Sequence, residues 1–116
     1  MHFRELQVWQ KGKLLAVEVY RHTQQGVLAR DYGLKDQLQR AAVSVPSNIV
    51  EGYVRETAKD RCHFLTIARG SIAELQTQIE IACECGMLDL PVARRLDESC
   101  EEISRMLTGL IKKLRQ

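Results

Sequence analysis

The chain has 116 residues, of which 45% are hydrophobic and 28% charged, and these values fit one globular domain rather than a disordered segment. Its 17 basic and 15 acidic side chains give a net charge of +2, well short of the strongly basic balance of a dedicated nucleic-acid-binding protein. No apolar run approaches the roughly 20 residues that a membrane-spanning helix needs, and the first residues lack a signal-peptide pattern, so we expect a cytoplasmic protein.

The first amphipathic segment spans residues 5–24, and Gly26 follows it as a helix stop. Two apolar stripes run along it, with Gly12 between them. The stripe expected to face the core consists of Leu6, Trp9, Ala16, Val17 and Tyr20. The stripe expected to contact another subunit consists of Val8, Leu15 and Val19, and the alternative is one broad core face.

The second segment spans residues 34–53 and contains Pro46. The proline removes one backbone hydrogen bond, and because the apolar face continues across it, the pattern favours a kinked helix over two separate helices. Gly52 and the polar stretch 54–59 are expected to form the next connection. The inward residues are Leu34, Leu38, Ala41, Ala42, Val45 and Ile49.

The third segment spans residues 59–85 and ends before Gly86. Gly70 and Ser71, in the middle of this helix, predict a place where another helix approaches closely. The apolar stripe consists of Phe64, Ala68, Ile72, Leu75, Ile79 and Ala82.

Asp89 is the expected N-cap of the fourth segment, which runs to Leu114 with Pro91 in its first turn. Its acidic residues precede its basic ones, an order that complements the helix dipole. The dipole explains the basic tail Lys112, Lys113 and Arg115, although a symmetric assembly would repeat it into a basic ring able to contact nucleic acid. The inward residues are Leu96, Cys100, Ile103, Leu107, Leu110 and Leu114.

No segment shows the alternation typical of strands. Four amphipathic helices joined by short connections bury their apolar stripes most simply as an antiparallel, up-down-up-down four-helix bundle. We therefore predict an all-α protein with one domain over residues 1–116.

The second segment also carries a recognisable pattern, Ser-x-x-x-Asn-Ile-x-Glu-Gly, from Ser44 to Gly52. With Gly33-Leu34, Gln37-Leu38 and the run 40–43 before it, the pattern resembles the signature of the bacterial four-helix-bundle family, also called the 23S rRNA intervening-sequence proteins. The resemblance covers almost the whole chain and departs from the family in the loop 26–29, where the family has a Phe-Pro pair. The flanking residues that share it are Phe3, Leu6, Val8, Trp9, Tyr20, Thr23, Phe64, Leu65, Ile67, Ala68, Gly70, Ser71 and residues 74–78.

The resemblance implies a closed bundle that assembles as a homopentamer and has no enzymatic activity. Some members are encoded within ribosomal RNA genes, and others are strongly basic accessory proteins of diversity-generating retroelements that contact nucleic acid and a reverse transcriptase. For this near-neutral chain we expect a non-enzymatic, homo-oligomeric scaffold or interaction module. The alternatives are an RNA- or DNA-binding accessory protein and, third, a small-ligand binder.

Polar side chains lie beside the core stripes of the second and third segments. They are expected to form a hydrogen-bonded network that sets the helix register, a subunit interface, or a small-ligand or catalytic site in which Glu51 and Glu74 pair. A di-metal site is excluded, because no Glu is followed three residues later by His. The stripe consists of Gln37, Arg40, Ser44, Asn48, Glu51, Ser71, Glu74 and Gln78.

The cysteine and histidine pattern predicts neither catalysis nor a bound metal or cofactor. The sequence contains no Cys-x-x-Cys pair, nucleophile motif or phosphate-binding loop, and no histidine has a second histidine or a cysteine three or four residues away. We expect reduced cysteines in or near the core and histidines at the surface. The residues are Cys62, Cys83, Cys85, Cys100, His2, His22 and His63.

Overall fold

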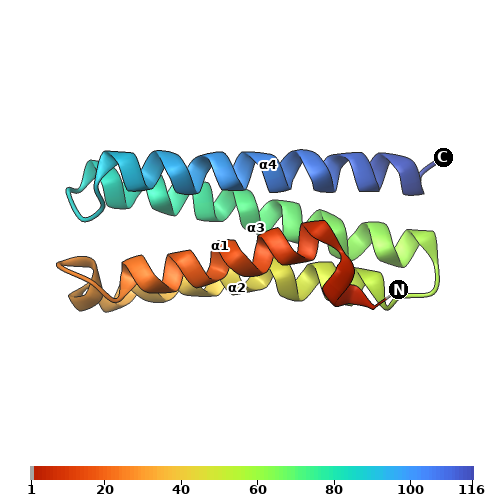
Figure 1. The fold of residues 1–116 in the computed structure, drawn as a ribbon, viewed down its shortest axis with the longest axis horizontal. Coiled ribbons are helices and arrows are strands. Elements are labelled where there is room, and N and C mark those ends of the chain that lie inside the picture. The colour runs from red at the N-terminus through yellow and green to blue at the C-terminus, as the bar shows by residue number, and fades with distance from the viewer. Residues whose placement is uncertain (1) are drawn as a thin grey trace.

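The computed structural model describes residues 2–116, which form four α-helices and two short 3-10 turns and no strand. Consecutive helices run antiparallel and pack side by side, and α4 returns beside α1, which confirms the predicted up-down-up-down bundle (Figure 1). None of these helices combines the length and apolarity that crossing a bilayer requires. The elements are η1 (Phe3–Glu5), α1 (Gln7–Thr23), η2 (Leu28–Arg30), α2 (Tyr32–Tyr53), α3 (Ala58–Glu84) and α4 (Leu90–Leu114).

Side chains and glycines fix the helix ends. The Asp31 carboxylate accepts a hydrogen bond from the Leu34 N–H (3.1 Å), and the Thr57 hydroxyl accepts one from the Asp60 N–H (3.1 Å). Gly26 and Gly86 follow α1 and α3 with φ of 60° and 74°, which confirms both as helix stops. Asp89 is the N-cap residue of α4, as predicted, although its side chain makes no capping hydrogen bond.

Helix α2 continues through Pro46 without interruption, so the proline does not divide it into two helices. The helix also includes Gly52, which the sequence assigned to the connection. An alanine Cβ at this glycine would lie 3.2 Å from the carbonyl oxygen of Arg61 in α3. Gly52 is therefore the position at which α2 and α3 come closest at this end.

The core largely follows the predicted stripes of α2, α3 and α4, except that Leu65 replaces the predicted Phe64 in α3 and that one exchange occurs in the last turns of α4. Ile111 is 2% exposed and packs in the core, whereas Leu110 is 39% exposed. Both residues continue the three-and-four spacing after Leu107, so the sequence pattern did not separate them. The consequence is an exposed leucine near the end of α4.

The expected core stripe of α1 is buried only at Ala16 and half-buried at Leu6 and Trp9, and the expected subunit contact through Val8, Leu15 and Val19 was wrong. These side chains are 4%, 2% and 1% exposed and lie in the core, while Val17 and Tyr20 are each 38% exposed. The reason is that the buried face includes Gly12. A Cβ at Gly12 would lie 3.5 Å from side-chain atoms of Val45 and Ile49, so α2 packs closely on this face of α1. A side chain larger than alanine at residue 12 would hold α2 farther from α1.

Gly70 does not serve the close approach that the sequence predicted. A Cβ at this position would have no atom within 4 Å, whereas one at Gly52 would meet backbone and side-chain atoms of α3. The two glycines therefore have opposite energetic roles inside their helices.

We expect Gly70→Ala to raise the free energy of unfolding by about 0.5–1 kcal/mol, because alanine is the better helix former and meets open space. Gly52→Ala should lower it by about 1 kcal/mol, because overpacking against Arg61 and Phe64 outweighs the gain in propensity. Urea denaturation followed by circular dichroism measures both. Equal stabilisation by the two substitutions would show that the contact at Gly52 is not a tight one.

Candidate functional site

The polar stripe forms a hydrogen-bonded cluster where α2 and α3 cross. The hydroxyl oxygens of Ser44 and Ser71 lie 2.7 Å apart, and the Asn48 amide donates to the Ser44 carbonyl oxygen (2.8 Å) and hydroxyl (3.0 Å). Ser71 is only 7% exposed. The cluster satisfies its own polar groups and links the middle of α2 to the middle of α3, which is the arrangement of a structural network.

The three charged members of the stripe lie outside this cluster, and two of them form ion pairs. Arg40 forms an ion pair with Asp36 (2.8 Å), and Glu51 forms one with Arg55 (2.7 Å). Arg55 lies just past the end of α2, whereas Asp36 and Arg40 occupy positions i and i+4 on an exposed face of that helix. Such pairs typically stabilise a helix by about 0.3–0.5 kcal/mol.

The Glu51–Glu74 carboxylate pair considered from the sequence does not form. Gly52 lies against Phe64 of α3, and Ser44 bonds to Ser71. Glu51 is therefore level with the start of α3, roughly 15 Å along the helix axis from Glu74. A catalytic pair of these carboxylates is excluded by the helix register.

The rest of the stripe lines a shallow groove of about 470 Å³ between α2 and α3, with Gln37 and Arg40 on one side and Glu74 and Gln78 on the other. The Gln78 side-chain oxygen is buried and has no hydrogen-bond partner among residues 2–116. Such a group costs about 1–3 kcal/mol when no donor reaches it. Within the polar stripe, the Gln78 amide is therefore the group whose hydrogen-bonding capacity is not satisfied by residues 2–116.

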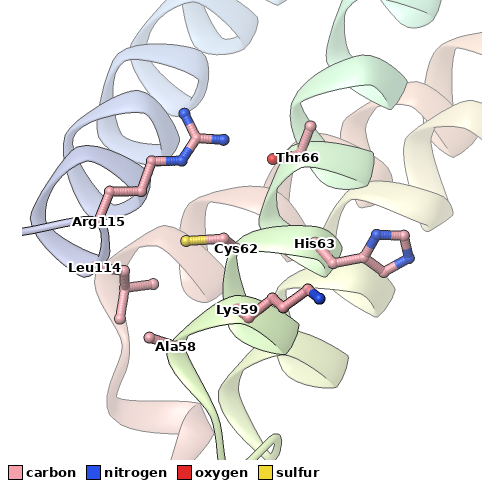
Figure 2. A pocket seen from close by; sticks show the side chains of 7 residues that line it. All are labelled: Ala58, Lys59, Cys62, His63, Thr66, Leu114 and Arg115. Atoms are coloured by element: carbon pink, nitrogen blue, oxygen red, sulfur yellow. The ribbon is translucent and has the colours of Figure 1, made fainter.

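The cysteines do not assemble a reactive centre. Burial, with help from the charges of Asp97 and Glu101, raises the pKa of Cys100 to about 12, so its thiol stays protonated and unreactive. Figure 2 shows the Cys62 side chain pointing toward α4, where Sγ lies 3.9 Å from the Ile111 carbonyl oxygen, while His63 points away from it. Residues 2–116 contain no group of three or more His, Cys, Asp or Glu side chains able to hold a metal ion.

Both termini and the α2–α3 connection lie at one end of the bundle (Figure 1), and basic side chains from α3 and from the end of α4 line two hollows there. Arg115 and Lys59 line one hollow there (Figure 2), and Lys113 and Arg61 line a second. The sequence singled out Lys112, Lys113 and Arg115 but not the cations at the start of α3. Only the antiparallel pairing of α3 with α4 brings the two groups together.

An apolar face, which we call the α1–α2 face, lies on the outer side of the seam between these helices. Gly12 packs on α2 at this seam, and the Gln39 amide donates to the Thr23 hydroxyl (3.0 Å) farther along it. Exposed and half-buried apolar side chains from both helices lie on this outer side, some next to the seam and others turned farther toward solvent. They are Trp9, Val17, Tyr20, Val43 and Val50.

Comparisons with known proteins place this geometry in context. The model of the 23S rRNA-intervening sequence protein family matches residues 4–109. A crystal structure of a protein with unknown function from the S23 ribosomal protein family of Bacteroides thetaiotaomicron has a TM-score of 0.83 at 20% identity, covering 90% of this chain and 98% of its own. At that identity the likeness concerns the fold alone. No curated protein matches the chain.

We expect Gln78→Met to raise the free energy of unfolding by about 1 kcal/mol, because it replaces an unsatisfied buried oxygen with an apolar group of similar size. Urea denaturation at protein concentrations that keep the chain monomeric measures the effect. Gln76→Met is the matched control, because the Gln76 amide donates to Asp97 (3.1 Å) and Glu101 (3.0 Å), and we expect it to be neutral or destabilising. A loss of stability in Gln78→Met would mean that Gln78 has a donor after all.

Proposed function

The chain belongs to the 23S rRNA-intervening sequence protein family, and from this premise we propose that it is a non-enzymatic interaction module that assembles with copies of itself. The observation that carries the proposal is the α1–α2 face. Val17, Tyr20 and Val43 are 38%, 38% and 41% exposed there, next to the half-buried Trp9. A second copy of the chain is the occupant we assign to this face.

Burial of this face supplies the driving force. Fully burying one valine-sized side chain contributes about 1.5–3 kcal/mol, so several partly exposed apolar residues on one surface favour association. Lys13 lies over the Trp9 ring, 5.5 Å from its centroid, and keeps a charged group within the face. In a symmetric assembly such a charge specifies orientation more than affinity. The subunit number expected from the family resemblance is five.

The other side chains support a binding role over catalysis. The Ser44 cluster uses its polar groups internally, and the Glu51 and Glu74 carboxylates are far apart. The groove beside Gln78 is shallow, and the exposed residues Gln37, Arg40 and Glu74 line much of it, so it gives the small-ligand alternative that used the polar stripe little support. Four free cysteines accord with the reducing cytoplasm, where we place the protein.

Nucleic-acid binding is the second candidate, and the basic end of the bundle favours it. Lys59 and Arg61 of α3 join Lys112, Lys113 and Arg115 there, although the net charge of the whole chain is only +2. Local clustering of this kind binds phosphates through counterion release. An assembly would multiply the cluster by its subunit number.

We expect Val17→Glu combined with Val43→Glu to reduce the assembly to a monomer, because removing the two charges from water in an apolar contact is too costly. Size-exclusion chromatography with light scattering gives the mass. Leu14→Glu is the matched control, because Leu14 is 58% exposed on the same helix but lies on the side toward α4. An assembly that survives the double substitution would overturn the proposed face.

Nucleic-acid binding at the basic end of the bundle can be tested by its salt dependence. A single-stranded RNA should bind at about 50 mM salt, and Lys112→Gln with Arg115→Gln should reduce the slope of log affinity against log salt by about two. Fluorescence anisotropy over a salt series measures the slope. Arg30→Gln with Arg94→Gln, at the opposite end, should leave it unchanged. Absence of binding at low salt would remove this candidate.

A further inference from the structure

The two ends of the bundle core are closed differently. At the end with the α1–α2 and α3–α4 connections, Leu28 of η2 is 1% exposed, and Met87 and Leu88 pack against the core. At the opposite end a cavity of about 570 Å³ opens between the ends of all four helices. This volume lies within the range of roughly 300–1,000 Å³ typical of small-molecule sites.

The cavity follows from the lengths of the helices. Lys11 of α1 forms an ion pair with Glu102 of α4 (3.1 Å), and α1 begins only four residues earlier, at Gln7. Because the two helices are antiparallel, the last turn of α4 extends past the start of α1. Leu110, 39% exposed, and the half-buried Leu114 therefore lack the helix that would cover them.

The lining of the cavity combines an apolar wall with two cations. Leu6, Val8, Ile49, Leu65, Leu110 and Leu114 supply the wall, and no carboxylate lines it. Arg61 and Lys113 supply the charge, and neither pairs with a carboxylate in the part of the chain that the structure describes.

The Arg61 side chain is held in place by its own backbone contact. Its Nε donates to the Arg55 carbonyl oxygen (2.7 Å), an arrangement that leaves the two terminal nitrogens of the guanidinium for another acceptor. An arginine fixed in this way is suited to a carboxylate, because its planar group matches the two carboxylate oxygens.

We propose that this cavity binds a small amphipathic carboxylate of the medium-chain fatty-acid class. The alkyl chain lies against the leucines between α1 and α4, and the carboxylate meets Arg61 and Lys113. A phosphate of RNA would use the cations but leave the apolar wall exposed to water. The site is separate from the α1–α2 face, so the proposal holds for a monomer as well as for an assembly.

Isothermal titration with sodium decanoate, below its micelle concentration, tests the proposal on the full chain. We expect saturable binding at one site per chain, at least about tenfold tighter than binding of hexanoate, because each buried methylene adds to the affinity. Decyltrimethylammonium, with a similar chain and the opposite charge, should bind at least about tenfold more weakly than decanoate. Methyl resonances of Val8, Ile49, Leu65 and Leu110 should shift on titration.

Two variants separate the site from the rest of the surface. Lys113→Gln should weaken decanoate binding by roughly five- to tenfold. The matched control Lys112→Gln removes the same charge from a neighbour that does not line the cavity, so it should change the affinity by less than about twofold. Leu110→Trp should abolish binding by filling the cavity while keeping the circular dichroism spectrum.

Three results would overturn the proposal. They are absence of saturable decanoate binding, equal affinity for the cationic amphiphile, and equal effects of Lys113→Gln and Lys112→Gln. Binding to anionic phospholipid vesicles without binding to free decanoate would also overturn it and would assign the end of the bundle to a membrane surface instead.

Discussion

The contact between Gly12 and α2 determines how the rest of the molecule is arranged. Because residue 12 has no side chain, the Val45–Ile49 turn of α2 packs directly on α1, and this contact selects Val8, Leu15 and Val19 for the core. Selecting that face leaves Val17 and Tyr20 exposed and Trp9 half-buried at the edge of the core. The surface to which we assign self-association is thus a by-product of the contact between Gly12 and α2.

Helices α2 and α3 are joined by polar as well as apolar contacts. Gly52 sets their spacing at one end, and the Ser44–Ser71 hydrogen bond sets their register in the middle. A shift of either helix by one turn would break this bond and bury unpaired hydroxyls, which costs more than an apolar mismatch. The pattern Ser-x-x-x-Asn in α2 therefore has a structural explanation: the asparagine holds the serine that bonds to α3.

Periodicity in the sequence predicted the four helices and most of the inward residues of α2 and α3, because each of these helices has one dominant apolar face. It failed where two choices had equal periodicity. The two stripes of α1 are similarly apolar, and Leu110 and Ile111 fit the α4 pattern equally well, so only the packing partner separates them. The sequence found the members of the polar cluster but also linked Glu51 with Glu74, since spacing along one helix carries no information about its register against another. For the same reason the meeting of Lys59 and Arg61 with the C-terminal cations, and the cavity beside them, could not be predicted from the sequence.

The reactivity of the Cys100 thiol reports how often α4 separates from the rest of the bundle. This thiol is fully buried on α4 among the core side chains, and its raised pKa keeps it protonated at neutral pH. A thiol in that position meets a solvent reagent only when α4 separates from its neighbours. The rate at which it reacts in native conditions therefore reports the free energy of that opening, whereas the exposed Cys85 reacts without any opening and supplies the intrinsic rate in the same molecule. The chain thus carries both the probe and the reference for native-state thiol exchange.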